Sequence, residues 1–383
     1  MTEHHRDLEE AERSSNNEKL ADQILTACLN VKEGENVWIH GWDHTIDLAS
    51  EIAFACKQKG AQPFVTIRTE DCWIRSLRKI SKDLLETLPT IETAALGQTD
   101  VFIFLLGPKS SIDWSTIPSE KRELANIWFL ESNNYMNAWR DLAKKKSVRM
   151  LGVEYCLATK ERAQALGLVY EEWKEAMLAG CLVNQQEIAR RALQLAKVIR
   201  TSRVVSIETP SGTKLKFKLG GREPILGDSV VSKEDGIRGI VKFLPSGFVE
   251  VAADEESAVG TVVYDAPILI RGKSIKDLTL HFKHGKIVKY SAWSAIEEFE
   301  GYLKSNGVDV DRFAFFGLGL NAGLKFGFTQ DDKVLGGVTI GIGGNEDKGG
   351  KNRTPGNRHW WASMTNATVS IDGKTIVADG FLR

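Results

Sequence analysis

The chain lacks an excess of charge of either sign and any long apolar run. Its 50 lysine and arginine residues nearly balance 51 aspartate and glutamate residues, which gives a net charge of −1. No global field therefore favours nucleic acid or an anionic membrane surface. The sequence also has no run of about 18 apolar residues, the length that a membrane-spanning helix requires. We expect neither nucleic acid nor a membrane as a partner.

The sequence has few cysteines, and no two of them are closely spaced. The five cysteines are dispersed without a C-x-x-C pair, at Cys28, Cys56, Cys72, Cys156 and Cys181. An odd, scattered set favours reduced core thiols in a cytoplasmic protein over a disulfide framework. The polar, acidic N-terminus has no apolar segment of the kind found in signal peptides. We predict that residues 1–17 form a disordered tail.

The remaining 366 or so residues exceed what one core usually needs, so two domains are predicted. Residues 18–200 alternate helical and extended patterns, including the fully apolar segment Val101–Leu106. A continuous apolar strand needs cover on both faces, which helices provide in a parallel sheet. We predict an open α/β domain over 18–200, with a junction helix at its end over Asn184–Arg200.

From residue 201 the pattern changes to alternation with period 2, as in Lys214–Lys218, and turns rich in glycine, proline and aspartate recur. Such alternation is typical of strands with one buried face. Residues 201–383 are therefore predicted to form a β-rich domain that carries the catalytic or ligand site. The predicted fold class is α/β, an open α/β domain followed by a β-rich domain.

Six short blocks of the second half follow one another in an order that resembles a known family. They are VVSIETPSGTKLKFKLGGR (204–222), LPSGFVEVAADEESAVGTVV (244–263), GLGLN (317–321), GVTIGIGG (337–344), GGKN (349–352) and RHWW (358–361). Their ordered series resembles the aminopeptidase T/S family of dinuclear metallo-aminopeptidases, over roughly residues 18–383. The same superfamily includes a non-haem iron dioxygenase acting on dihydroxypyridine, so the fold does not fix the reaction. The resemblance also implies a homodimer.

Most metal ligands of that family are replaced in this sequence. The five ligand positions that the resemblance implies fall on Phe248, Phe315, Thr339, His359 and Trp361, and only the histidine is retained. Two neighbouring metal ions need several anionic oxygens to balance their charge. Phenylalanine and tryptophan offer no suitable ligand, and threonine is a poor one for zinc or manganese. We therefore expect no metal and no other cofactor.

A rebuilt site for one divalent metal (iron, zinc or manganese) is the alternative. It would combine His359 with Glu250 and a further acid from 254–256. An iron triad of two histidines and a carboxylate would need His281 or His284 as well. Their spacing places these two side chains on opposite faces of a strand.

The leading functional hypothesis is an enzyme that hydrolyses an amide-type bond in a small polar substrate. His359 would act as general base or acid near neutral pH, and Glu250 would orient it or share its proton. Further substrate contacts are predicted from side chains in the same blocks: Asn321, Thr339 and Asn352 by hydrogen bonds, and Trp360 or Trp361 as a pocket wall.

Two other functions stay open at this stage. One is a single-metal, iron-dependent ring-cleaving dioxygenase, and the other is a non-catalytic relative that binds a ligand or a protein partner. Each candidate residue also has a structural interpretation. His359 fits a buried, hydrogen-bonded histidine, Trp360 and Trp361 fit core or interface aromatics, and Asn321 and Thr339 fit hydrogen bonds to backbone.

Overall fold

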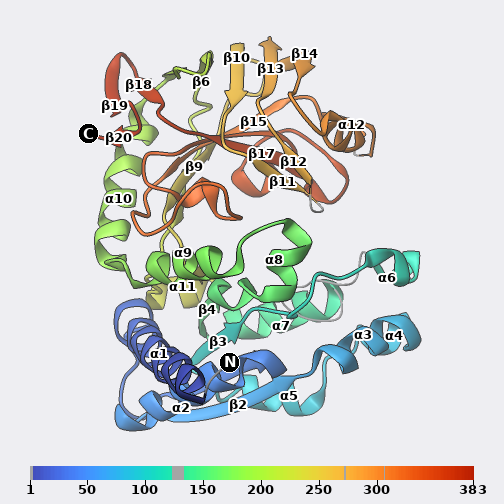
Figure 1. Cartoon of the computed structure of the whole chain (residues 1–383), viewed down its shortest axis with the longest axis vertical. Coiled ribbons are helices and arrows are strands. Elements are labelled where there is room, and N and C mark those ends of the chain that lie inside the picture. Colours follow the sequence, from blue (N-terminus) through green and yellow to red (C-terminus); the bar gives the residue numbers. More distant parts are fainter. Residues whose placement is uncertain (1–2, 123–132, 271–272, 306) are drawn as a thin grey trace. The chain divides into compact units, whose positions relative to one another are not determined.

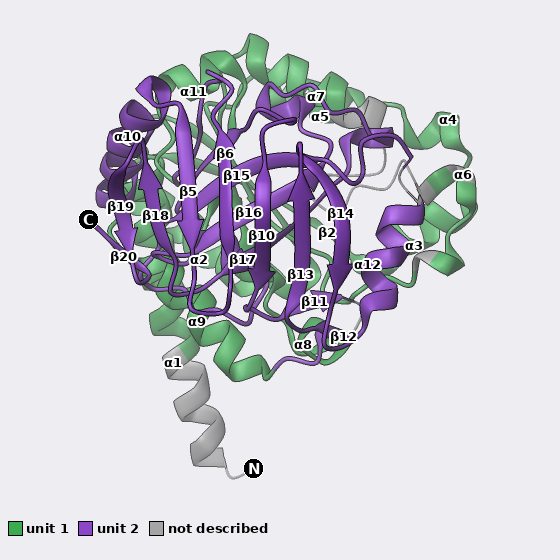
Figure 2. Ribbon diagram, turned by 90° about the horizontal axis from the view of Figure 1, so that it is seen from above, with its two compact units in different colours: residues 1–165, 169–185, 229–245 green, residues 166–168, 186–228, 246–383 purple. Residues whose placement is uncertain are grey.

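The computed structural model describes residues 3–122, 133–270, 273–305 and 307–383 (Figure 1). The chain divides into two compact units, drawn in two colours in Figure 2. Unit 1 comprises residues 1–165, 169–185 and 229–245, and unit 2 comprises residues 166–168, 186–228 and 246–383. The units are thus interleaved in sequence, unlike the single boundary near residue 200 that the change in periodicity predicts. Residues 229–245 return to unit 1 because they contain a strand of its sheet.

Unit 1 is built on a five-stranded parallel sheet with the order β2-β1-β3-β4-β8. Its strands are β1 (Asn36–Trp42), β2 (Gln62–Arg68), β3 (Val101–Leu105), β4 (Arg149–Val153) and β8 (Val241–Leu244). All five residues of β3 are buried, as the apolar pattern there predicts. Alternate side chains of β3 enter two separate cores, because successive residues of a strand point to opposite faces.

Helices cover both faces of this sheet. One core packs α1 (Glu3–Asp22), the π-helical turn Gln23–Cys28 and α2 (Ile46–Gln58) against Val101, Ile103 and Leu105. The other packs α5 (Thr90–Leu96) and α7 (Asn133–Lys145) against Phe102 and Phe104. The other helices of this unit are α3 (Glu70–Lys79), α4 (Lys82–Leu85), α6 (Ser119–Arg122), α8 (Lys160–Leu166, whose last residue lies in unit 2), α9 (Tyr170–Leu182) and α11 (Lys233–Arg238).

One local prediction differs from the structure. A helix, α1, begins at Glu3 where a disordered tail was expected over 1–17. Its glutamate, arginine, alanine and leucine residues are good helix formers, so polarity there did not mean disorder. Helix α3 has no counterpart among the sequence predictions. The sequence also favours a helix over Ser119–Asn126; the structure has α6 at its start, and residues 123–126 lie outside the described residues.

Unit 2 consists mainly of antiparallel β-structure, as predicted for the second half. Its larger sheet has eight strands in the order β14-β13-β10-β6-β5-β18-β19-β20, most of which lie side by side in Figure 2. They are β5 (Val204–Glu208), β6 (Lys214–Lys218), β10 (Val259–Tyr264), β13 (Leu278–Lys283), β14 (Lys286–Ser291), β18 (Thr368–Ile371), β19 (Lys374–Ala378) and β20 (Phe381–Leu382).

A second sheet of five antiparallel strands has the order β17-β16-β15-β9-β7. Its strands are β7 (Ile225–Gly227), β9 (Phe248–Ala252), β15 (Phe313–Gly319), β16 (Val338–Gly343) and β17 (His359–Met364). A hairpin of β11 (Ile268–Ile270) and β12 (Lys273–Ile275) and the helices α10 (Gln185–Thr201, whose first residue lies in unit 1) and α12 (Ile296–Ser305) complete the unit, with 3₁₀ turns over Asp331–Lys333, Glu346–Lys348 and Pro355–Asn357.

Aromatic rings join the two large sheets of unit 2. The Phe217 ring of β6 lies 4.8 Å from Phe313 and 5.6 Å from Phe316, both on β15. The Phe282 ring of β13 lies 5.6 Å from Phe313. One face of the five-stranded sheet is therefore buried against the eight-stranded sheet. Among the described residues, no helix is long and apolar enough to cross a membrane.

Candidate functional site

The candidate residues lie on the five-stranded sheet of unit 2, on the face that does not pack against the eight-stranded sheet. Glu250 on β9 is paired with Gly317 on β15, Gly317 with Thr339 on β16, and Thr339 with Ser363 on β17. Directly paired residues of antiparallel strands present their side chains on the same face. The register thus aligns Glu250, Thr339 and Ser363 in one row. Thr339 and Ser363 are joined by a hydrogen bond of 2.9 Å between their hydroxyl oxygens.

The neighbouring rows of this face are aromatic. Phe315 is paired with Gly341, Gly341 with Trp361, and His359 with Gly343. A β-bulge between Phe313 and Phe315 lets Phe313 enter the core while Phe315 faces away from it. Gly341 makes room for the Phe315 ring, since a Cβ atom there would lie 2.1 Å from a ring carbon. The Phe315 and His359 rings meet edge to face, 5.4 Å apart.

A lysine ammonium lies over this row. Lys348, at the end of the 3₁₀ turn after β16, places its Nζ 3.1 Å from Glu250 Oε2 and 3.3 Å from Asp347 Oδ2. The same nitrogen lies 4.8 Å from the centre of the Phe315 ring. The Asn357 side-chain amide donates a hydrogen bond of 2.7 Å to the other oxygen of Asp347. We call Glu250, Lys348, Asp347, Phe315 and His359 the sheet-face cluster.

Burial and charge set the protonation states in the sheet-face cluster. Burial raises the pKa of Glu250, and the attraction of the Lys348 ammonium opposes that shift. For Lys348, burial lowers the pKa, but the carboxylates of Glu250 and Asp347 outweigh it and hold it above its ordinary value. Burial and the nearby Lys348 charge lower the pKa of His359. His359 is therefore a neutral imidazole near pH 7.

His359 also lines a pocket of about 280 Å³ within unit 2. Its Nδ1 atom is buried and has no hydrogen-bond partner among the described residues. Asp331, from the 3₁₀ turn Asp331–Lys333, lines the same pocket and accepts hydrogen bonds of 3.0 Å and 3.2 Å from the backbone N–H groups of Gly327 and Phe328. Burial nevertheless raises the pKa of Asp331 to about 7. One pocket thus contains a neutral base, the His359 imidazole, and a carboxyl group with a pKa near neutrality, that of Asp331.

The other predicted substrate contacts occupy different surroundings. Asn321 is fully buried, donates to the Ser246 carbonyl (2.7 Å) and accepts from the Gly323 N–H (2.9 Å). Asn352 donates to the carbonyls of Phe313 (3.0 Å) and Gly343 (2.9 Å). Both asparagines fix backbone around the sheet.

The two tryptophans differ in orientation. The Trp360 ring lies 5.3 Å from Phe299 and 5.4 Å from Tyr302, both on α12. Trp361, one residue later, lies in the row of Phe315 on the opposite face. Both residues line the pocket beside His359.

The further ligands considered for a single metal have other partners. His281 lies on β13 of the eight-stranded sheet and is 3.0 Å from the Thr261 hydroxyl. Glu255 is paired with Arg222 at 2.8 Å and accepts from Asn345 and from the Lys351 backbone. His284 lies in the turn after β13, with a positive φ of 49°. The structure brings none of these three into the sheet-face cluster.

Sequence reasoning missed Lys348, Asp347 and Asp331. All three lie in short turns after or between strands, where charged residues are usually solvated. Only the composition of the glycine-rich loop 343–353 hinted at Asp347 and Lys348. It places charged residues between Gly344 and Gly349, directly after a strand that is wholly buried.

The sequence of this chain matches one known protein family. Residues 13–306 match the family model of the thermophilic metalloproteases (M29), so the chain belongs to this family. No curated protein sequence matches it. The resemblance that the sequence blocks indicate is thereby confirmed.

Two solved structures share the fold. Wild-type AmpT from Thermus thermophilus matches with a TM-score of 0.67 and 18% identity, covering 96% of this chain and 99% of its own. The 2,5-dihydroxypyridine dioxygenase from Pseudomonas putida KT2440 matches with a TM-score of 0.63 and 18% identity, covering 97% of each chain. The fold is a mixed α/β architecture with a parallel sheet and an antiparallel β-rich region, as predicted.

The expectation of no cofactor is wrong, because the family is one of metalloproteases and therefore points to a metal. The residues of the sheet-face cluster do not supply the set of ligands that a metal ion requires. Among the described residues, no group of three or more histidine, cysteine, aspartate or glutamate side chains is arranged to hold a metal ion. Glu250 is the one carboxylate of its row, and the Lys348 ammonium group already balances its negative charge.

Proposed function

We propose that the protein is a hydrolase that cleaves an amide-type bond in a small polar substrate bound in the pocket beside His359. The observation that carries this proposal is the His359 imidazole. It lines a pocket, its pKa is lowered by burial and by Lys348, and its buried Nδ1 has no partner among the described residues. A buried polar atom without a partner costs free energy, and a catalytic role is one reason for a protein to retain it. Membership of a metalloprotease family supports the reaction class.

In this proposal His359 is the general base. It takes a proton from water while the water oxygen attacks the amide carbonyl carbon. Asp331, in the same pocket and with a pKa near 7, is the corresponding acid. It gives its proton to the leaving nitrogen as the C–N bond breaks. Two titratable groups whose surroundings push their pKa values in opposite directions are suited to such divided roles.

Glu250 then acts as a positioning residue. Its carboxylate contacts Lys348 at 3.1 Å, and the Lys348 charge in turn lowers the pKa of His359. The ion pair therefore keeps His359 neutral and fixes the loop that carries Lys348. This differs from the role predicted from sequence, in which Glu250 orients His359 directly.

Kinetics on a panel of aminoacyl-p-nitroanilides test the proposal, with and without added Zn²⁺, Mn²⁺ or Fe²⁺. His359→Gln should lower kcat/KM by about 100-fold or more, since general base catalysis contributes roughly 10²–10⁴-fold. His281→Gln, on the other sheet, is the matched control and should retain activity. Equal activity of His359→Gln and the wild type would exclude His359 as the base. A panel without any turnover would favour a non-catalytic ligand-binding protein.

We also infer a homodimer in the cytoplasm. The dimer rests on resemblance to the family, and light scattering of the purified chain tests it by mass. The compartment is supported by the cysteines, which form no disulfide among the described residues and which, except for Cys72, are buried.

A further inference from the structure

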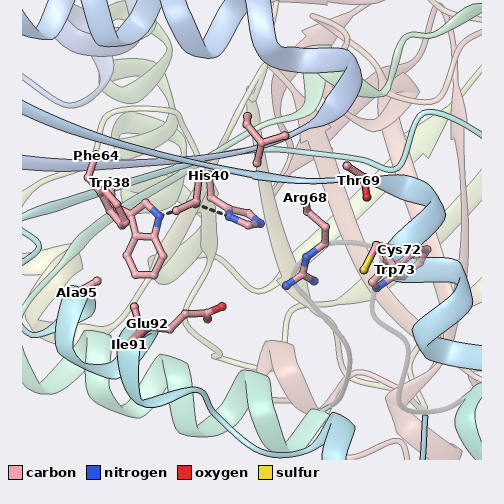
Figure 3. A pocket seen from close by; sticks show the side chains of 12 residues that line it. Trp38, His40, Phe64, Arg68, Thr69, Cys72, Trp73, Ile91, Glu92 and Ala95 are labelled. Atoms are coloured by element: carbon pink, nitrogen blue, oxygen red, sulfur yellow. Dashed lines mark hydrogen bonds between the residues drawn. The ribbon is translucent and has the colours of Figure 1, made fainter. Parts of the chain in front are cut away.

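Unit 1 contains a second pocket that the proposed reaction does not use. It has a volume of about 330 Å³, near the lower end for small-molecule sites. Strands β1 and β2 form its floor, and helices α3 and α5 form its sides (Figure 3). All of the described residues that line it belong to unit 1.

A chain of hydrogen bonds orders the floor of this pocket. Trp38 is paired with Phe64, and His40 with Thr66, so all four side chains share one face of the sheet. The Trp38 indole N–H donates to Thr66 Oγ1 at 2.7 Å, and the same oxygen lies 2.8 Å from His40 Nδ1. Since the hydroxyl accepts from Trp38, its own proton is available for His40. Thr66 can therefore donate to Nδ1, and this contact fixes the orientation of the His40 ring.

This arrangement leaves His40 with a donor for a ligand. Burial and the neighbouring Arg68 charge lower the pKa of His40 to about 3, so the ring is neutral near pH 7. With Nδ1 accepting from Thr66, the single ring proton lies on Nε2. Figure 3 places this second nitrogen on the side of the ring that faces Arg68. The Nε2–H group and the Arg68 guanidinium thus form a donor-rich end of the pocket.

The remaining lining supplies a negative charge and apolar walls. Glu92 of α5 brings a carboxylate to the same pocket, below His40 in Figure 3. Trp38 and Phe64 are in ring contact at 5.6 Å, and Ile91 lies opposite them on α5. Phe64 and Ile91 remain 46% and 80% exposed. A ligand that covers them would remove this apolar surface from water.

We propose that this pocket binds a small zwitterion with an aromatic body, of the chemical class of the aromatic α-amino acids. The carboxylate of the ligand would lie against Arg68 and the Nε2–H of His40, and its ammonium against Glu92. The ring would pack on Trp38 and Phe64, under Ile91. Opposite charges at one end and aromatic walls at the other match both features of such a molecule.

Calorimetric titration of the full chain tests the proposal with four probes: L-phenylalanine, L-tryptophan, phenylacetate and phenethylamine. Each charged contact is expected to contribute roughly tenfold in affinity, or about 1.4 kcal/mol. At least one amino acid should therefore bind, and phenylacetate and phenethylamine should each bind about tenfold more weakly. No binding of either amino acid at about 10 mM, a concentration well above a millimolar Kd, would overturn the proposal. Equal binding of phenylacetate would overturn the zwitterion class.

Single-residue variants test whether the amino acid binds in this pocket. Arg68→Gln and Glu92→Gln should each weaken amino acid binding about tenfold, and Thr66→Val should weaken it while Thr66→Ser restores it. Arg75→Gln, an exposed position on α3, is the matched control and should bind like the wild type. His359→Gln should also bind like the wild type, which separates this site from the proposed reaction. Because Glu92 lies on a short, partly exposed helix, its variant remains informative if a strand variant fails to fold. Unchanged binding by Glu92→Gln would contradict the proposal.

Discussion

The Lys348 ammonium lies 3.1 Å from the Glu250 carboxylate, and the two side chains are only 10% and 11% exposed. This pair lies on the sheet face where the family resemblance implies metal ligands, beside Phe315 and His359. A positive charge is thus held on that face by a side chain of the protein itself. The relationship has consequences for stability as well as for the proposed chemistry.

Removing the positive partner should be costly. Lys348→Met would leave the Glu250 carboxylate buried without its cation, and breaking a buried pair typically costs about 3–5 kcal/mol. Urea unfolding measures this loss. Lys273→Met, which breaks an exposed contact with Glu297 and Glu298, is the control and should cost far less, because water screens exposed ion pairs. A loss at Lys348 no larger than that at Lys273 would contradict the buried pair.

Asp331 should make stability depend on pH. Its pKa rises from 3.8 in its ordinary state to about 7 in the folded protein because of burial. Between about pH 4 and 7 the unfolded chain has lost this proton and the folded chain retains it, so the free energy of unfolding falls as pH rises. Asp331→Asn should remove that fall, and its stability relative to the wild type should increase from pH 4 to pH 8. Asp71→Asn, exposed on α3, should show no such trend.

Gly341 should be required by the Phe315 ring. A Cβ atom at this position would lie 2.1 Å from a ring carbon, so Gly341→Ala must displace the ring or the strand. Overpacking of this kind typically costs about 1–3 kcal/mol, measured by urea unfolding. Gly301→Ala in α12 meets no atom within 4 Å and should be neutral or stabilising. The double variant Phe315→Ala, Gly341→Ala should relieve the clash, and its failure to do so would argue against this contact.

Asn345 should anchor the glycine-rich loop that carries Lys348. It is fully buried, donates to Glu255 (3.1 Å) and to the Ala314 carbonyl (2.9 Å), and accepts from the Asn352 N–H (2.9 Å). Asn345→Ala would leave these groups unsatisfied, at a cost of about 1–3 kcal/mol. Hydrogen exchange should become faster across 343–353. Asn137→Ala, exposed on α7, should leave exchange in that loop unchanged.

The fold was largely predictable because periodicity is a local property. Val101–Leu106 indicated a buried parallel strand, and Lys214–Lys218 alternates in burial as its residues alternate in polarity. The interleaving of the two units was not predictable, because β8 joins the parallel sheet by pairing with β4, which lies about ninety residues earlier in the chain. No local pattern encodes that partner.

The candidate site was predictable only in part. The sequence blocks pointed to His359 and Glu250 as candidates and, through the family resemblance, to four further positions where metal ligands were expected. They did not reveal that a bulge turns Phe315 out of the core, since a bulge depends on the register of two strands. Nor did they assign Lys348, because a lysine in a glycine-rich turn becomes a buried partner only when the loop folds back over the sheet.

The sequence by itself determined the two kinds of structure and the family, since each depends on residue identity and order. Tertiary structure decided which charges meet. Glu250 and Lys348 are almost a hundred residues apart, and only the pairing of β9, β15 and β16 with the turn after β16 brings their atoms to 3.1 Å. Electrostatic interactions depend on distance and burial, and both are properties of the folded chain.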